Sequence, residues 1–499
     1  EQTQTNFSPA IAADELRYGV RREILKPPSV ETLTFRNNSN QKALPARDWN
    51  AFQMGYSVGG AGKHWAANAW RFNPSDFEMA TRVRDRYHGM KLADGLIVQD
   101  WGVSYAELEP FYDRIEKIAG ISGKAGVMNG EKQSGGNPFE GSRQSEYPTP
   151  PLIRSHWNDI FHKTTEKMGY HPFPIPAGTI GAAYTNPLGI NLAPCTYCGY
   201  CGFYGCGNFS KSSPNICVVP ALMDRTNFTL LTECTALHID KADDEKTVTG
   251  VTFLDSDGNT GFQPADIVCL SAYQLDNVRL LLLSKIGTPY DAATGTGTLG
   301  RAYNYQTMSM GYGYFENELM NPFISTGALS TQIDDFNGDN FDHTGLGFIG
   351  GAGIQALSDQ GTPLSMTDRL PAGTKMWGSE WKRGFQHSYQ NFAKIQGQGT
   401  SYSHRDSYLS LDPHYTDKNG QPLLRLTFDY NENDRLMARF IQKKIDEIYR
   451  FTGAKSWETE AFPDKHNSPF RAYDSSHTIG GAVMGLDPKT SVLNRYQQH

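Results

Sequence analysis

The sequence has no long hydrophobic run and no excess of basic residues. Its 499 residues carry a formal net charge of −7, and apolar stretches such as "VRLLLLSKIG" are short. A membrane-spanning helix needs about 18 or more apolar residues in a row, and nucleic-acid binding needs clustered lysine and arginine. The chain is therefore predicted neither to cross a membrane nor to bind nucleic acid. The printed sequence also does not open with a signal-peptide pattern.

Cysteine is scarce, with seven residues in the whole chain. Four of them stand together in "CTYCGYCGFYGC": Cys195, Cys198, Cys201 and Cys206. Closely spaced thiolates of this kind hold iron–sulfur clusters. The spacing favours such a cluster, with zinc and a redox-active disulfide as alternatives. The remaining cysteines stand in apolar or strand-like stretches and are predicted to be buried: Cys217, Cys234 and Cys269.

Hydrophobic periodicity predicts an α+β fold with mixed sheets. Apolar residues at helical spacing predict helices over 104–119, 155–169, 274–287 and 433–451. Alternation predicts strands over 228–240, 247–259 and 265–272, with a "DG" hairpin turn between the last two. Residues 301–430 alternate short β-like runs with turns and predict a mostly β region.

Two glycine-rich stretches differ in what they predict. "GTGTLG" (295–300) matches the dinucleotide pattern G-x-G-x-x-G, but it leads into a strand-like segment instead of a helix, so we interpret it as a loop. "VGGAGKHWAANAWRF" (58–72) places glycines beside His64 and Trp65, where backbone and rings can border a planar ligand. A glycine-rich turn with a core tryptophan is the alternative.

A late stretch, "SSHTIGGAVMG" (475–485), sets His477 just before a pair of glycines. A histidine can accept a proton from an alcohol near neutral pH, and small neighbours leave space for substrate. A structural histidine is the alternative.

Taken in order, these segments resemble the glucose–methanol–choline (GMC) oxidoreductases, in particular the flavoprotein large subunits of bacterial gluconate 2-dehydrogenase-like and fructose dehydrogenase-like enzymes. The resemblance covers essentially the whole chain and is most specific in "VGGAGKHWAANAWRFNPSDFE", "CTYCGYCGFYGC" and "SSHTIGGAVMGLDPKTSVLNRY". It implies an α/β FAD-binding domain, a substrate domain with a mixed or antiparallel sheet, and an FAD-dependent alcohol dehydrogenase.

The resemblance also implies roles for particular residues. Residues bordering FAD are expected to be Gly59, Gly60, His64 and Trp65, with Ala236 and Ser271 as contacts on the adenine side. His64 matches the flavin-linked histidine of related pyranose oxidases, which makes a covalent histidyl–FAD bond a hypothesis. His477 matches the family base, which takes the hydroxyl proton while hydride passes to flavin N5.

Related dehydrogenases with such a cysteine loop hold an iron–sulfur cluster, commonly the three-iron 3Fe-4S kind in preference to 4Fe-4S, so one of the four cysteines is not required as a ligand. The cluster passes single electrons to a multihaem cytochrome c subunit, and a small third subunit carries the export signal. The resemblance thus implies the periplasmic face of the bacterial inner membrane, with membrane association only through partners. A cytoplasmic location is the alternative.

The expected domain boundaries follow the same resemblance. The FAD-binding domain is expected in three parts, 1–130, 195–305 with the cysteine loop, and 472–499 with the catalytic histidine. Residues 131–194 are expected to form an excursion, and 306–471 the substrate domain. The family opens with a strand–GxGxxG–helix unit and continues past this chain's last residue to a second catalytic residue. We therefore expect the printed chain to be part of a longer protein.

The predicted function is oxidation of a secondary alcohol of a sugar or sugar acid, in the manner of gluconate 2-dehydrogenase. A glycoside 3-dehydrogenase of the same family is one alternative. A non-catalytic cysteine-cluster scaffold, holding zinc or iron–sulfur, is the alternative from another class.

Overall fold

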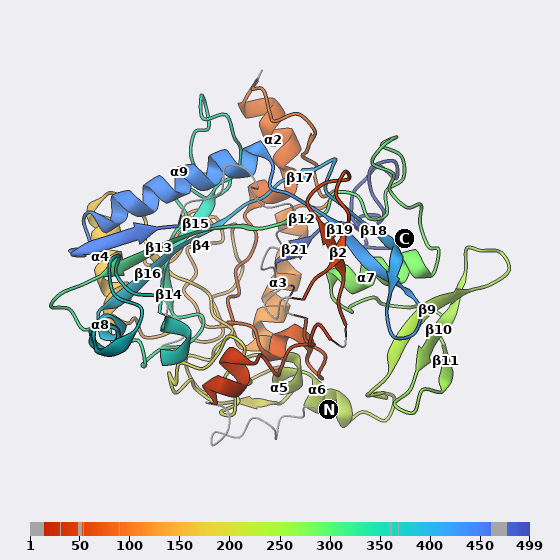
Figure 1. The fold of residues 1–499 in the computed structure, drawn as a ribbon, viewed down its shortest axis with the longest axis horizontal. Helices are drawn as coiled ribbons and strands as arrows, with labels where there is room; N and C mark the ends of the chain where they lie inside the picture. The colour runs from red at the N-terminus through yellow and green to blue at the C-terminus, as the bar shows by residue number, and fades with distance from the viewer. Residues whose placement is uncertain are drawn as a thin grey trace.

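The computed structural model describes residues 14–29, 31–47, 52, 54–88, 90–358, 362–367, 369–460 and 477–499. Helices and sheets are interspersed along the chain, as Figure 1 shows. The α-helices in the described part are α2 (Met79–Arg86), α3 (Tyr105–Ala119), α4 (His156–Lys167), α5 (Pro214–Cys217), α6 (Val219–Met223), α7 (Gln274–Leu283), α8 (Gly378–Gln390) and α9 (Glu432–Tyr449). Shorter helical turns are η2 (Glu15–Val20), η3 (Gly60–Lys63), η4 (Pro74–Glu78) and η5 (Pro363–Met366).

One half of the molecule is built on a six-stranded antiparallel sheet of order β20-β13-β16-β15-β14-β6. Its strands are β6 (Phe173–Pro174), β13 (Thr307–Tyr314), β14 (Ser330–Ile333), β15 (Ala352–Leu357), β16 (Phe392–Gly399) and β20 (Ser456–Thr459). Helix α9 lies across one face of this sheet, and α4 packs on the same face through a shared apolar core (Figure 1). Gly313 permits the close approach, since a Cβ there would lie 2.4 Å from the ring of Tyr449.

Two of the predicted helices show why the sequence forms them. Ser104 caps α3, accepting a hydrogen bond from the backbone N–H of Glu107, while Glu107 bonds back to the amide of Ser104. Asn431 caps α9 in the same way through the amide of Asp434. The apolar stripe of α9 is then buried in the core, with Ile441 and Ile445 almost fully enclosed. All four helices expected from periodicity are present.

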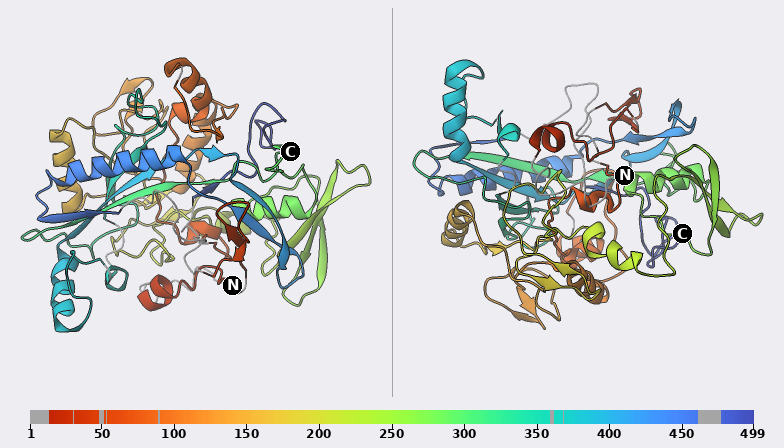
Figure 2. Two further views of the ribbon diagram at one scale, coloured as in Figure 1. Left: turned by 45° about the horizontal axis from the view of Figure 1, so that its top comes forward. Right: turned by 90° about the horizontal axis from the view of Figure 1, so that it is seen from below.

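The other half combines a four-stranded sheet, β18-β19-β1-β2, with a three-stranded sheet, β11-β10-β9, and helix α7. The strands are β1 (Thr34–Arg36), β2 (Leu44–Pro45), β9 (Thr235–Lys241), β10 (Val248–Leu254), β11 (Thr260–Pro264), β18 (Tyr408–Thr416) and β19 (Pro422–Thr427). Only β1 and β19 pair in parallel within these two sheets. Figure 2 shows β9–β11 projecting at one end and α8 projecting at the other.

The strand prediction for 265–272 is wrong. The hairpin that turns at Asp257 and Gly258 pairs β10 with Thr260–Pro264, and the chain then runs as an irregular, partly exposed segment to α7. Gly258 has a φ of 82°, which suits a tight turn. Helix α8 lies inside the region expected to be mostly β and was not predicted. "GTGTLG" is a loop, as expected, because it leads into a strand and no helix.

The remaining strands form short two-stranded ladders: β3 (Leu96–Ile97) with β17 (Ser403–His404), β4 (Val127–Met128) with β5 (Glu131–Lys132), β7 (Tyr184–Thr185) with β8 (Asn191–Leu192), and β12 (Asn304–Tyr305) with β21 (Thr478–Ile479). Among the described residues, no helix has both the length and the apolar composition needed to span a bilayer.

Candidate flavin site and active site

The glycine-rich loop around η3 has little space for side chains. Gly59 adopts a φ of 97°, and a Cβ there would lie 2.5 Å from the side-chain oxygen of Asn215. Gly60 also has a positive φ, but no atom lies within 4 Å of its Cβ position. The loop thus needs glycine at Gly59 for packing, whereas the space beside Gly60 is open to a ligand.

His64 ends this turn and is nearly enclosed, with 6% of its surface exposed. Burial, assisted by the positive charge of Lys211, lowers the pKa of the His64 imidazole to about 4, so the ring is neutral at pH 7. Its Nε2 atom is buried and has no hydrogen-bond partner within the described part of the chain. A neutral ring nitrogen without a partner has the chemistry required of a group that binds or attaches to a cofactor.

Trp65 follows directly and packs on a glycine. A Cβ at Gly178 would lie 2.7 Å from the Trp65 ring, and the ring joins the apolar cluster of Ala67 and Leu329. Its indole Nε1 is buried and finds no acceptor among the described residues. Two buried, unpartnered nitrogens in consecutive residues fit a large polar ligand such as a flavin beside this loop.

Lys211 joins the glycine-rich loop to the cysteine loop, and no sequence pattern marks it. Its ammonium group is buried and donates hydrogen bonds to three backbone carbonyls, those of Trp65 (3.0 Å), Cys201 (2.8 Å) and Tyr204 (2.7 Å). The amide of Phe203 also donates to the carbonyl of His64 at 2.8 Å. The segments quoted separately from the sequence, 58–72 and 195–206, are therefore held against each other.

The four cysteines of residues 195–206 differ in their exposure to solvent. Cys201 is buried, Cys195 and Cys206 are partly buried, and Cys198 is exposed. The Cys201 thiol lies 3.3 Å from the hydroxyl of Thr326. Burial raises the pKa of Cys195 to about 12 and also raises that of Cys201, where the charge of Lys211 opposes the shift.

The four thiols do not meet at a metal-ion site in this structure. Within the described ranges, no three histidine, cysteine or acidic side chains come together as ligands of one ion. The expectation of a formed metal centre at these cysteines is therefore not supported by the geometry, which also gives no zinc site. All seven cysteines are free thiols, so the disulfide alternative is wrong for this structure. Of the three cysteines expected to be buried, Cys217 is, whereas Cys234 and Cys269 are exposed.

His477 stands at the edge of the β12–β21 ladder. It directly precedes β21, whose Thr478 pairs with Tyr305 of β12. The backbone that follows packs closely against the segment before β12, because a Cβ at Gly480 would lie 1.9 Å from the carbonyl oxygen of Ala302. The side chain of His477 stays exposed, yet the surrounding protein lowers its pKa by desolvation. A neutral, accessible imidazole is suited to accept a proton.

Ala236 and Ser271, the expected adenine-side contacts, are both exposed. Ala236 lies in β9 opposite Phe253 of β10, and Ser271 lies in the extended segment just before α7. Because α7 packs against β9, the two residues belong to one side of the molecule.

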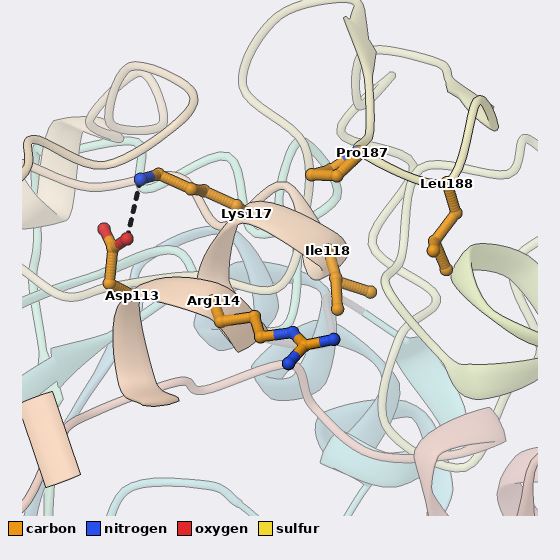
Figure 3. Close-up of a pocket in the computed structure, with 6 residues that line it drawn as sticks. All are labelled: Asp113, Arg114, Lys117, Ile118, Pro187 and Leu188. Atoms are coloured by element: carbon orange, nitrogen blue, oxygen red, sulfur yellow. Dashed lines mark hydrogen bonds and ion pairs between the residues drawn. The ribbon is translucent and has the colours of Figure 1, made fainter. Parts of the chain in front are cut away.

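A shallow surface pocket of about 380 Å³ lies between α3 and the β7–β8 hairpin (Figure 3). Its lining is Asp113, Arg114, Lys117, Ile118, Pro187 and Leu188. Lys117 is paired with Asp113 at 2.6 Å, as the dashed line in Figure 3 shows. None of the predicted site residues lines it.

Comparison with known proteins decides the family. Residues 101–302 and 403–499 match the GMC oxidoreductase family. The chain is 40% identical over 489 residues to the gluconate 2-dehydrogenase flavoprotein of Pantoea cypripedii, covering 97% of this chain and 79% of that protein. This chain belongs to the GMC oxidoreductase family. It is an FAD-dependent enzyme acting on alcohols, and the non-catalytic scaffold alternative is thereby excluded.

More distant relatives extend the comparison. The GMC oxidoreductase is 23% identical to the fructose dehydrogenase large subunit of Gluconobacter japonicus, over 92% of this chain and 76% of that one. It is 26% identical to the 2-methyl-1,2-propanediol dehydrogenase of Mycolicibacterium austroafricanum, over 89% and 73%. A crystal structure of formate oxidase shares the fold, with a TM-score of 0.51 and 13% identity over 97% of this chain and 85% of that chain.

Proposed function

We propose that this GMC oxidoreductase oxidises a secondary alcohol of a sugar acid, as a gluconate 2-dehydrogenase. The observation that carries the proposal is the 40% identity to a gluconate 2-dehydrogenase flavoprotein along nearly the whole chain. His477 is the base: its exposed, neutral imidazole takes the hydroxyl proton of the substrate. FAD, when bound, accepts the hydride from the same carbon.

We further propose that FAD is attached to the chain through His64. The support is local: the imidazole is enclosed, neutral, and has a ring nitrogen without a partner in the described structure. Replacing His64 by alanine is expected to release FAD on acid precipitation, whereas the unmodified protein keeps it in the pellet. Equal release from both proteins would contradict the covalent bond.

The cysteine loop is proposed as an iron–sulfur site, with a 3Fe-4S cluster preferred. The support is the thiol spacing and the buried Lys211, whose pKa is lowered by burial and raised by the thiols of Cys201, Cys206 and Cys198 around it. When bound, such a cluster passes single electrons onward. We propose a cytochrome c subunit as acceptor, a small export subunit as partner, and the periplasmic face of the inner membrane as location.

The cluster proposal has a matched test. Cys201→Ser and Cys217→Ser remove two equally buried thiols, one inside the loop and one outside it. Iron content is expected to fall in the first variant only, and EPR of the oxidised protein to lose its signal with it. Iron-free unmodified protein, isolated without oxygen, would disprove the cluster.

The catalytic proposal is tested separately on full-length protein loaded with FAD. Anaerobic addition of gluconate is expected to bleach the flavin absorption band. The product is then a keto acid, with the carbonyl at the oxidised carbon. No bleaching by gluconate, with bleaching by a glucoside, would favour the glycoside 3-dehydrogenase alternative.

A further inference from the structure

The six-stranded sheet has a second face that carries a row of amides. Successive side chains of a strand point to opposite faces of the sheet. The residues that alternate with those contacting α9 therefore lie on the second face. At one end of this second face, aromatic residues of β13 and β16 pack against α8. At the other end stand four glutamines: Gln306, which directly precedes β13, Gln355 on β15, and Gln396 and Gln398 on β16.

These glutamines form a hydrogen-bonded chain. Gln306 donates through Nε2 to Oε1 of Gln398 at 3.3 Å, and Gln398 donates to Oε1 of Gln396 at 3.5 Å. Gln355 donates to the same oxygen of Gln396 at 3.2 Å. The amide nitrogens at both ends are thus engaged, and the orientation of each amide is fixed by its neighbour.

The amide oxygens of the two terminal glutamines in this hydrogen-bonded chain have no described donor. Oε1 of Gln306 and Oε1 of Gln355 are buried and accept no hydrogen bond from any described residue. Gln355 is fully enclosed, with 0% of its surface exposed, while Gln306 is partly exposed. A buried amide oxygen without a donor is unfavourable, so each requires a donor that is not among the described residues, such as a water or a ligand hydroxyl.

The β12–β21 ladder brings Gln306 near His477. Asn304 pairs with Ile479 and Tyr305 with Thr478, where the ladder ends. Gln306 and His477 are the next residues along the two segments, so their backbones lie close to each other. Alternate residues of a strand project to the same side, and Tyr305 belongs to the apolar core. Extending this alternation by one residue puts Asn304, Gln306 and His477 on the side opposite Tyr305.

Asn304 supplies the complementary group. Its side chain is 1% exposed, its oxygen accepts a hydrogen bond from the amide of Tyr305, and its Nδ2 donates to no described residue. Among the described residues, one acceptor and one donor without partners therefore stand two positions apart on the segment that runs beside His477. An alcohol hydroxyl is both donor and acceptor, and can satisfy the two together.

We propose that Gln306 is a specificity-determining residue, which accepts a hydrogen bond from the hydroxyl next to the one being oxidised, with Asn304 donating to the same oxygen. The substrate class is then a vicinal diol within a polyhydroxylated chain. The inference rests on the proposed function of His477 as the base, and it identifies which neighbouring hydroxyl the site recognises. Gln398, Gln396 and Gln355 act as positioning residues, since they orient the amide of Gln306.

The test compares gluconate with 3-deoxygluconate, which lacks the hydroxyl beside the carbon that a 2-dehydrogenase oxidises. Full-length protein loaded with FAD is mixed with each compound, and the flavin reduction rate is measured over a concentration series. In Gln306→Met, which keeps the side-chain volume and removes the amide, the preference for gluconate is expected to fall about 10-fold or more. The rate with 3-deoxygluconate is expected to stay within about 2-fold of the unmodified protein.

Two further variants complete the comparison. Gln398→Met leaves Gln306 in place but removes its orienting partner, and is expected to reduce the preference by a smaller factor, mainly through KM. Gln133→Met, on the chain just after the β4–β5 hairpin, is the control and is expected to leave the preference unchanged.

The outcomes separate the two proposals. If Gln306→Met discriminates between the two compounds as well as the unmodified protein does, the free oxygen is satisfied by a structural water and the inference is wrong. If neither compound reduces the flavin of the unmodified protein, the proposed function fails, and this inference with it. Loss of both rates to the same extent would mean that Gln306 supports the fold and does not recognise the hydroxyl.

Discussion

The two histidines of the candidate site occupy opposite environments. His64 is enclosed in a glycine-rich turn with 6% of its surface exposed, whereas His477 stays exposed at the start of a two-residue strand. Desolvation lowers the pKa of both rings, so both are neutral at pH 7. The same residue type therefore has the same charge in both places, and access to solvent is what differs.

This difference separates the roles that the two rings can have. An enclosed ring with an unpartnered nitrogen cannot exchange a proton readily with water, and is suited to hold a cofactor. An exposed neutral ring can accept a proton from substrate and return it to solvent in each turnover. Three predictions test whether the two histidines differ in this way.

The largest effect is expected at the exposed histidine. His477→Asn removes the proton acceptor, and the rate of flavin reduction by gluconate is expected to fall roughly 10²- to 10⁴-fold. The FAD content and melting temperature should change little, because the side chain is exposed. His238→Asn changes a partly exposed histidine beside Asp240 on β9; it is the control and should react at the unmodified rate. A loss of FAD in His477→Asn would assign that residue to binding.

The enclosed histidine is expected to affect stability through pH. The pKa of His64 is about 4 in the folded chain and 6.5 in the unfolded one, so the unfolded state binds more protons between these values. The free energy of unfolding should therefore fall by roughly 3 kcal/mol as the pH drops from about 6.5 to about 4. His64→Asn should lack this component. Denaturant unfolding of the FAD-free protein across that range measures it, and parallel curves for the two proteins would refute it.

The smallest effect is expected at the lysine that joins the two loops. Lys211→Met leaves three buried carbonyls without their donor, and should destabilise the fold by roughly 1–3 kcal/mol. Loss of its charge should also raise the pKa of His64, which can be followed by NMR of the imidazole. If that pKa does not move, enclosure alone keeps His64 neutral.

Some elements could be predicted from local sequence because their causes are local. The Ser104 cap and the Asn431 cap each stand directly before an apolar stripe, and both helices formed where expected. The strand predicted over 265–272 did not form. Their alternation is strand-like, but the shorter segment Thr260–Pro264 follows the turn directly and takes the place beside β10. Alternation alone cannot say which of two segments a neighbouring strand will pair with.

The residues of the candidate site divide in the same way, into those that a local sequence pattern marks and those that it does not. Glycine spacing beside His64 and the late position of His477 are visible in the sequence, and so is the cysteine spacing. The sequence does not point to Lys211, Gln306 or Gln355, because a single lysine or glutamine forms no recognisable pattern. Their importance arises from partners distant in the chain, as in the bond from Lys211 to Trp65.

The family motifs, the starts of the capped helices α3 and α9 and the residue types available for chemistry are local properties, since they depend on neighbours within a few positions. Long-range folding alone encloses His64, leaves His477 open, keeps the four thiols from meeting around one ion and links Gln306 to Gln398 on a distant strand. Burial and long-range pairing are properties of the folded chain as a whole, and they set the charge and the reach of each group.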